Sequence, residues 1–184
     1  FVNEDIDSFD EKHRIQAYAS FVDDHTLSLS TGGTLTADKI IIATGSRPNI
    51  PGFFEQAKDL LITNDDVFYW DDLPKSIAVF GAGVIGLELG QALHRLGVHT
   101  HLFGVGDAVG PLSDPEVIAT SLEIFKDEFP FHSNGQVKSI ERTDKGVQIT
   151  FKPTPDSEEV TETFDYLLAA TCRKTNIDNI GIEN

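Results

Sequence analysis

The sequence has a single cysteine and no methionine among its 184 residues. With Cys172 alone, no disulfide can form within the chain, which favours a reducing compartment, and we expect a cytoplasmic location. The chain opens at Phe1 without a signal-peptide pattern. We therefore expect that it does not begin at a native initiation codon.

Basic residues and long apolar runs are also scarce. Lysine and arginine together number 14 against 30 aspartate and glutamate residues, which gives a formal net charge of −16. Affinity for nucleic acid and for anionic lipid depends on Lys and Arg neutralising phosphates, so we expect no nucleic-acid partner and no membrane partner. No stretch approaches the roughly 20 apolar residues of a membrane-spanning helix. Hydrophobic residues still make up 40% of the sequence, which predicts a globular chain rather than a disordered one.

A segment of thirteen residues occurs twice, at 38–50 and at 165–177, with five identical positions. Short alternating segments precede each copy, at 14–22 and 26–30 before the first, and at 137–142, 147–151 and 160–164 before the second. We interpret each copy as a β-meander that leads into a buried strand. The alternative is that two apolar strands ending in Ala-Thr resemble each other by chance.

Between the two copies the sequence predicts a strand, a glycine-rich turn and a helix. Residues 76–80 form a short apolar run typical of a parallel strand that is buried on both faces. Apolar residues at helical spacing follow as far as Gly97, which ends the helix, and residues 98–103 predict a second strand. Ser113–Glu116 has the spacing of a capping box and predicts the start of another helix.

The run Gly81-Ala-Gly83-Val-Ile-Gly86 lies directly between the predicted strand and helix. In this context Gly81 allows the tight turn, Gly83 lets the backbone approach a pyrophosphate, and Gly86 lets the helix pack closely on the strand. The N–H groups of the first helical turn offer an anion site that requires no lysine, which suits so acidic a chain. The alternative is a glycine-rich turn without a ligand; we favour nucleotide binding.

Glu88 lies at the edge of the apolar face of this helix. An unpaired carboxylate is costly there, so a cationic partner is one interpretation. The other is a carboxylate at the edge of solvent that the helix dipole stabilises, and spacing alone favours it. His99 and His101 alternate on one strand and share a face, but two imidazoles without a third ligand nearby in sequence do not predict a metal site. We expect these histidines to pack or to face solvent, and we expect no metal.

Three motifs together resemble the pyridine nucleotide-disulfide oxidoreductases, and within them the dihydrolipoamide dehydrogenases. They are Ile77–Gly90, Ala43-Thr-Gly-Ser-Arg-Pro48 and Ala170-Thr-Cys-Arg173, which fall in the family order over nearly the whole chain. The resemblance implies an FAD-binding unit interrupted by an NAD(P)-binding Rossmann unit, each with a meander, which accounts for the repeat. The predicted fold class is therefore α/β, a Rossmann-like domain with a parallel sheet and a β-meander, plus a meander and strand from an interrupted FAD-binding domain.

The resemblance also implies four segments and a set of contacts. The segments are a partial FAD-binding domain at 1–50, a connection at 51–74, the NAD(P)-binding domain at 75–172 and a return segment at 173–184. The implied NAD contacts are Gly81, Ala82, Gly83, Val84, Ile85, Gly86, Leu87, Glu88, Gly104, Val137 and Cys172. The implied FAD contacts in a full-length protein are Ala19, Thr44, Gly45 and Ser46. Glu88 would have a supporting role near nicotinamide and flavin, and no residue of this chain is expected to be catalytic.

Two positions depart from the family pattern. Cys172 stands where the family has a glycine, so its side chain is expected to clash with the dinucleotide or to shift the loop. We expect this thiol to be buried and inert rather than a redox centre. Gly104 stands where NAD-specific members have an acid that bonds the adenine ribose, which weakens the preference for NAD over NADP.

The function that the resemblance implies is the NAD(H)-binding part of an FAD-dependent oxidoreductase similar to dihydrolipoamide dehydrogenase. Such an enzyme passes electrons between a small dithiol or disulfide, FAD and NAD. The alternatives are an NADPH-dependent reductase of the glutathione or mercuric type, a transhydrogenase and, outside the enzymes, a nucleotide-sensing module. The full-length protein is expected to be a homodimer through a C-terminal domain that this sequence lacks, and this chain alone is expected to be inactive.

Overall fold

The computed structural model describes residues 8–183, which belong to two compact units. Unit 1 comprises the residues up to 47 and those from 175 onward, and unit 2 comprises Pro48–Lys174. The chain passes between the units within β4 (Ser46–Pro48) and β13 (Arg173–Thr175), which pair with each other. No described helix is long and apolar enough to cross a membrane.

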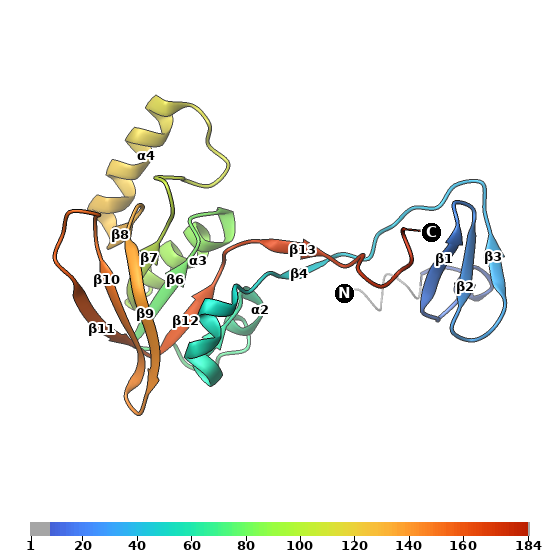
Figure 1. The fold of residues 1–184 in the computed structure, drawn as a ribbon, viewed down its shortest axis with the longest axis horizontal. Helices are drawn as coiled ribbons and strands as arrows, with labels where there is room; N and C mark the ends of the chain where they lie inside the picture. The colour runs from blue at the N-terminus through green and yellow to red at the C-terminus, as the bar shows by residue number, and fades with distance from the viewer. Residues whose placement is uncertain (1–7, 184) are drawn as a thin grey trace. The chain divides into compact units, whose positions relative to one another are not determined.

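Unit 1 contains the antiparallel meander that the alternating segments predict (Figure 1). Its strands pair in chain order and are β1 (Ala19–Asp23), β2 (Thr26–Leu29) and β3 (Thr34–Thr36). A short 3₁₀ helix, η1 (Glu11–His13), precedes them. The backbone N–H of Phe21 donates to the carbonyl oxygen of Ile180 at 2.7 Å, so the end of the chain is attached to β1.

A parallel five-stranded sheet forms the centre of unit 2. In sheet order its strands are β5 (Leu61–Ile62), β12 (Tyr166–Ala169), β6 (Ser76–Phe80), β7 (His99–Phe103) and β8 (Phe131–His132). Residues 77–79 of β6 have no exposed surface, as expected for a strand in the middle of a parallel sheet. The predicted strands at 76–80 and 98–103 are thus confirmed.

Helices cover one face of this sheet. α3 (Val84–Arg95) connects β6 to β7, and α4 (Pro115–Glu128) connects β7 to β8 (Figure 1). Leu87 and Leu93 of α3 share a buried apolar cluster with Leu102 of β7. A one-turn helix, α2 (Asn64–Val67), precedes β6. The predicted order of strand, helix, strand and helix is confirmed.

A second antiparallel meander covers the opposite face of the sheet. Its strands are β9 (Gln136–Thr143), β10 (Gly146–Lys152) and β11 (Val160–Phe164), with β10 in the middle. Phe151 and Phe164 pack with Phe80 and Phe103 of the sheet in a separate buried cluster. The 3₁₀ helix η2 (Gly52–Leu60) joins this cluster through Phe54. The segment at 51–74 therefore supplies core residues as well as a connection.

The start of α4 differs in detail from the capping box predicted at Ser113–Glu116. Asp114 is the N-cap, and its Oδ1 accepts hydrogen bonds from the N–H groups of Glu116 at 2.9 Å and Val117 at 3.1 Å. Pro115 follows at the first helical position, where its missing N–H removes no helical hydrogen bond. Asp114 rather than Ser113 is the N-cap because Pro115 favours the first helical position, which places the helix start one residue later than predicted.

The apolar run at 40–43 is not a strand, contrary to the prediction. No regular structure forms at 37–45, and Ile41 is 90% exposed. A buried strand of a parallel sheet needs a partner along its edges, and no described strand pairs with this run. Its counterpart in the second copy is the strand β12, because β5 and β6 flank it.

Candidate nucleotide-binding site

The glycine run forms the loop between the carboxyl end of β6 and the start of α3. Three backbone hydrogen bonds fix it to its neighbours: Gly81 N–H donates to Phe103 O at 2.8 Å, Ala170 N–H to Phe80 O at 2.8 Å, and Gly110 N–H to Ala82 O at 2.7 Å. The loop is therefore held between the carboxyl ends of β7 and β12. In open α/β sheets this edge is where ligands bind.

Each glycine of the motif has a different environment. Gly81 has φ +113°, and a Cβ on it would lie 2.3 Å from the carbonyl oxygen of Ala170. A Cβ on Gly86 would lie 1.8 Å from the carbonyl oxygen of Gly81. Gly83 has an ordinary φ of −76°, and a Cβ on it would meet nothing within 4 Å. Gly81 thus makes the turn and Gly86 the close packing, whereas Gly83 presents bare backbone to open space.

The N-terminus of α3 lacks an acceptor from its own cap. Gly83 is the N-cap, no side chain caps the helix, and the first helical hydrogen bond runs from Leu87 N–H to Gly83 O at 3.0 Å. The N–H groups of the first helical turn have no partners inside a helix. A phosphate group supplies both the acceptors and the negative charge that this end of a helix favours. The loop fits the pyrophosphate of a dinucleotide.

A groove of about 570 Å³ opens beside the loop, a size typical of ligand pockets. It brings together six of the predicted NAD contacts, namely Gly81, Ala82, Gly83, Gly104, Val137 and Cys172. A second hollow of about 220 Å³ adjoins it, and its lining includes Gly83, Val84, Ile85 and Cys172. These residues come from the loops that follow β6, β7 and β12, from the start of α3 and from β9. The fold thus assembles parts of the chain that are far apart in sequence.

Three predicted contacts lie outside both hollows. Gly86 and Leu87 are buried behind the loop, so Leu87 can reach a ligand only through its backbone. Glu88 is exposed, and no described residue forms a hydrogen bond or ion pair with its side chain. This exposure agrees with the solvent-edge interpretation of Glu88 rather than with a cationic partner inside this chain.

The profile of one protein family, described as pyridine nucleotide-disulphide oxidoreductase, matches residues 2–184. The chain belongs to this family. It is 33% identical over 152 residues to a dihydrolipoyl dehydrogenase of Bacillus subtilis, a match that covers 82% of this chain and 32% of the relative. It is 32% identical over 171 residues to a soluble pyridine nucleotide transhydrogenase of Photorhabdus laumondii, covering 90% of this chain and 36% of the relative. The chain therefore spans about a third of the length of these relatives.

A solved structure shares the fold of this oxidoreductase family member. It is the Cu(II) complex of the HOCl-induced flavoprotein disulfide reductase RclA from Escherichia coli, with a TM-score of 0.72 over 92% of this chain and 38% of that one. The sequence identity is 21%, so the comparison concerns the fold alone. It supports the predicted α/β class.

Gly104 has a structural reason to lack a side chain in this member of the oxidoreductase family. A Cβ there would lie 3.1 Å from Ala82 Cβ and 3.2 Å from both Phe131 Cε2 and the carbonyl oxygen of Ser133. An acid at this position would have to displace these neighbours. Further along the same loop, Asp107 accepts a hydrogen bond from the hydroxyl of Ser133.

Cys172 is exposed, so the expectation that its thiol is buried is wrong. The strand β12 ends at Ala169, and the following loop turns outward along the groove. Two hydrogen bonds to Asn49 hold it: the Asn49 N–H donates to Cys172 O at 3.0 Å, and the Thr171 hydroxyl donates to Asn49 O at 3.0 Å. The side chain at 172 is therefore held at the rim of the groove.

Sequence reasoning missed the four aromatic residues of the groove, of which two lie outside the parallel sheet. Phe53 and Phe54 line it from η2, in the segment at 51–74 that was predicted only to connect. The signal that could have found them is the adjacent aromatic pair near the start of this connection. Phe54 also packs against Phe80 with ring centroids 4.8 Å apart, so it belongs to both core and groove.

The residues implied for FAD lie in unit 1. Ala19 is in β1, Ser46 is in β4, and Thr44 and Gly45 are exposed. Asn176 holds the loop, because its backbone N–H donates to Gly45 O at 3.0 Å and its side-chain amide to Thr44 O at 3.1 Å. The described part of unit 1 contains no helix longer than η1. It therefore offers no helix N-terminus for the pyrophosphate of FAD, and the FAD contacts stay predictions for a longer protein.

Proposed function

We propose that this chain is the NAD(H)-binding part of a flavin-dependent oxidoreductase of the dihydrolipoamide dehydrogenase type. The observation that carries the proposal is the uncapped N-terminus of α3 at Gly83, which lies beside a groove of about 570 Å³. Both are at the carboxyl edge of a parallel sheet, the place where dinucleotides bind to such folds.

The residues of this chain would bind and orient the dinucleotide. The first-turn N–H groups of α3 take the pyrophosphate, and the bare backbone at Gly83 allows it to come close. The apolar lining, which includes Phe53, Phe103 and Val137, covers ring surfaces of the ligand and keeps water away from them. In the longer protein, FAD supplies the exchange of electrons between the nicotinamide and a dithiol or disulfide.

NAD(H) is the cofactor that the charges favour. None of the residues that line the groove is Lys or Arg, and Asp107 lies on the loop that borders it. A 2′-phosphate in the groove would meet no cation among the residues that line it and would lie near the Asp107 carboxylate. Arg95 and His101 on neighbouring elements are occupied elsewhere, because Arg95 binds Glu128 with 2.5 Å between Nε and Oε1 and His101 lies near Glu162. Arg173, which lines the adjoining hollow, donates from Nη1 to Asn64 Oδ1 at 3.3 Å.

A transhydrogenase is the second candidate, because the match to the Photorhabdus protein covers 90% of this chain at 32% identity. A disulfide reductase and a nucleotide-sensing module are weaker candidates. The activity of the longer protein distinguishes these four candidate functions. Oxidation of dihydrolipoamide by NAD supports the dihydrolipoamide dehydrogenase type, and hydride transfer between NADPH and NAD supports the transhydrogenase. Reduction of glutathione disulfide or mercuric ion would identify a reductase, and the absence of any turnover would identify a sensing module.

We propose that the longer protein is a cytoplasmic homodimer.

Calorimetric titration of NADH into the 184-residue chain tests the binding proposal. We expect one NADH per chain and weaker binding by Gly83→Ala, because the added methyl stands where the pyrophosphate must approach. Gly52→Ala is the matched control, since a Cβ at Gly52 also meets nothing within 4 Å and the residue lies outside the groove lining. The purified chain should be colourless, without bound FAD. Equal NADH affinity in wild type and folded Gly83→Ala would contradict the proposed site.

A further inference from the structure

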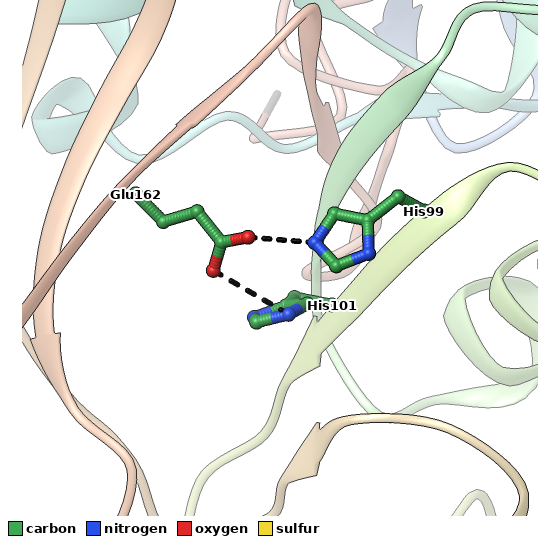
Figure 2. A group of neighbouring side chains, drawn as sticks. All are labelled: His99, His101 and Glu162. Carbon is green, nitrogen blue, oxygen red and sulfur yellow. Dashed lines mark hydrogen bonds and ion pairs between the residues drawn. The ribbon is translucent and has the colours of Figure 1, made fainter.

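We propose that His99, His101 and Glu162 form a binding site for a divalent transition-metal ion, with Zn²⁺ as the expected occupant. The two histidines lie on β7 of the parallel sheet, and Glu162 reaches them from β11 of the meander (Figure 2). None of the three lines the nucleotide groove. The proposed site is thus separate from the nucleotide-binding function and does not depend on it.

The three side chains converge on one point. Glu162 Oε1 lies 2.6 Å from His99 Nε2, and Glu162 Oε2 lies 3.5 Å from His101 Nε2. The prospective ligand atoms all lie within 4.8 Å of one another. Zinc bonds of about 2.0–2.1 Å in a tetrahedron put ligand atoms about 3.3 Å apart, so shifts of roughly 1 Å complete the geometry. His99 and Glu162 have the freedom to make them, since their side chains are 54% and 29% exposed.

The strand geometry explains why these histidines act together. Residues two apart on a strand point to the same face, and here that face lies under the meander. Glu162 of β11 is paired with the buried Ile149 of β10, so both side chains are on the meander face that covers the parallel sheet. The Glu162 side chain therefore lies over β7. Two imidazole nitrogens and one carboxylate oxygen are ligands that zinc accepts, and three protein ligands leave one position open to water. The His99 side chain is 54% exposed, so solvent water can reach the open position beside it.

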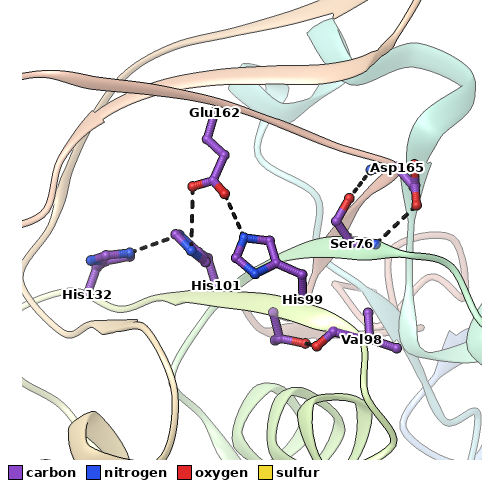
Figure 3. A network of polar contacts seen from close by, with 8 residues as sticks. Ser76, Val98, His99, His101, His132, Glu162 and Asp165 are labelled. Carbon is purple, nitrogen blue, oxygen red and sulfur yellow. Dashed lines mark hydrogen bonds and ion pairs between the residues drawn. The ribbon is translucent and has the colours of Figure 1, made fainter.

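A fourth histidine supports the arrangement from behind. His132 Nε2 lies 3.1 Å from His101 Nδ1, the ring nitrogen that does not face Glu162 (Figure 3). A metal-ligating histidine commonly donates its other ring N–H to such an acceptor, which fixes the ring. His132 Nε2 is placed to accept such a hydrogen bond from His101 Nδ1.

The donor set predicts which ions bind. Imidazole nitrogen suits zinc, copper and nickel, whereas magnesium prefers oxygen ligands and keeps most of its waters. A bound ion would join β7 to β11 and so link the parallel sheet to the meander. Because only the folded chain brings Glu162 to the histidines, the ion stabilises the folded state. We therefore expect the melting temperature to rise with Zn²⁺ concentration.

Calorimetry with Zn²⁺ alone tests this site. The 184-residue chain is used without a histidine tag, stripped with chelator, and with Cys172→Ser in every variant so that the exposed thiol cannot contribute. We expect one zinc ion per chain and no comparable binding of Mg²⁺. His99→Asn and Glu162→Gln should each weaken binding by about a hundredfold or more, beyond the effect of losing an outer partner. His132→Phe, which keeps an aromatic ring beside Phe103, should weaken it by about 10- to 100-fold.

His25→Asn is the matched control, because His25 lies in unit 1 and its Nδ1 contacts the carbonyl oxygen of Ala37. It should bind zinc as wild type does. Melting curves without metal show whether each variant is folded, and the exposed His99 makes its variant the decisive one. Absence of stoichiometric zinc binding would overturn the proposal. So would zinc affinity that is unchanged in folded His99→Asn and Glu162→Gln, or equally strong binding of Mg²⁺.

Discussion

Alanine at two glycines of the same loop should have opposite consequences. At Gly86 the new Cβ would lie 1.8 Å from the carbonyl oxygen of Gly81, whereas Cβ atoms essentially never come within 3.0 Å of such an atom. The helix or the loop has to move by more than about 1 Å, and the contact is with backbone, which cannot rotate away. At Gly83 the new Cβ meets nothing within 4 Å, and the backbone is already extended.

The structure sets the size of each effect. Overpacking of a rigid core costs about 1–3 kcal/mol and sometimes more, and the backbone clash puts Gly86→Ala at about 3 kcal/mol or above. For a chain of this size that lowers the melting temperature by about 6–12 °C. Gly83→Ala loses roughly 0.5–1 kcal/mol at the N-cap and gains a similar amount from a stiffer unfolded chain. It should instead weaken NADH binding by about 1–3 kcal/mol, or about 5- to 150-fold.

Urea unfolding followed by tryptophan fluorescence measures the first effect. Trp70 is the one tryptophan of the sequence and stacks on Tyr166 of β12 with ring centroids 5.5 Å apart, so it reports on the central sheet. Calorimetry with NADH measures the second effect. Wild-type stability of Gly86→Ala would refute the packing argument. Unchanged NADH affinity of a folded Gly83→Ala would refute the pyrophosphate site while leaving the packing argument intact.

Three further predictions concern single carboxylates. Asp114→Ala removes the N-cap of α4 and should lower the free energy of unfolding by about 1 kcal/mol in urea titrations. The hydrogen bond from Arg95 lowers the pKa of Glu128, so the ionised Glu128 carboxylate stabilises the folded chain above about pH 4.5, and this contribution is lost as the pH falls through the lowered pKa. Glu128→Gln should therefore flatten the acid part of the curve of melting temperature against pH. Wild type should bind NADH about tenfold more tightly than NADPH, and Asp107→Asn should remove most of that difference in paired titrations at equal salt; a wild-type preference for NADPH would contradict the charge argument.

The order of β6, loop and α3 was predictable from the sequence because each part has a local signal. A run of apolar β-branched and aromatic residues, a glycine spacing and a helical period lie next to one another, and all three agree with the final structure. The turn at Gly81 and the close packing at Gly86 follow from the same run. The groove was only partly predictable, because Phe53 and Phe54 reach it from a separate segment, in the 3₁₀ helix η2, which is interrupted at Lys58.

The histidine cluster shows what sequence spacing leaves out. His99 and His101 predict a shared face, but Glu162 meets them only because the meander folds over β7 and its register puts residue 162 opposite Ile149. Nothing local in the sequence specifies which residue of β11 lies above which residue of β7. The absence of a third ligand near in sequence was therefore a weak argument against a metal site, since strands bring distant ligands together as readily as helices bring near ones.

The repeated segment shows the same limit for secondary structure. The runs at 40–43 and 167–169 share an aspartate before them, an apolar core and an Ala-Thr ending, yet only the second is in a strand. The second run lies between β5 and β6, so its N–H and carbonyl groups are paired on both sides and its apolar side chains are buried. The first has no described partner strand, and Ile41 stays 90% exposed. Strand propensity mainly measures how well side chains fit a paired and buried surface. The same apolar pattern therefore forms a strand where neighbouring strands pair with it and irregular structure where none does.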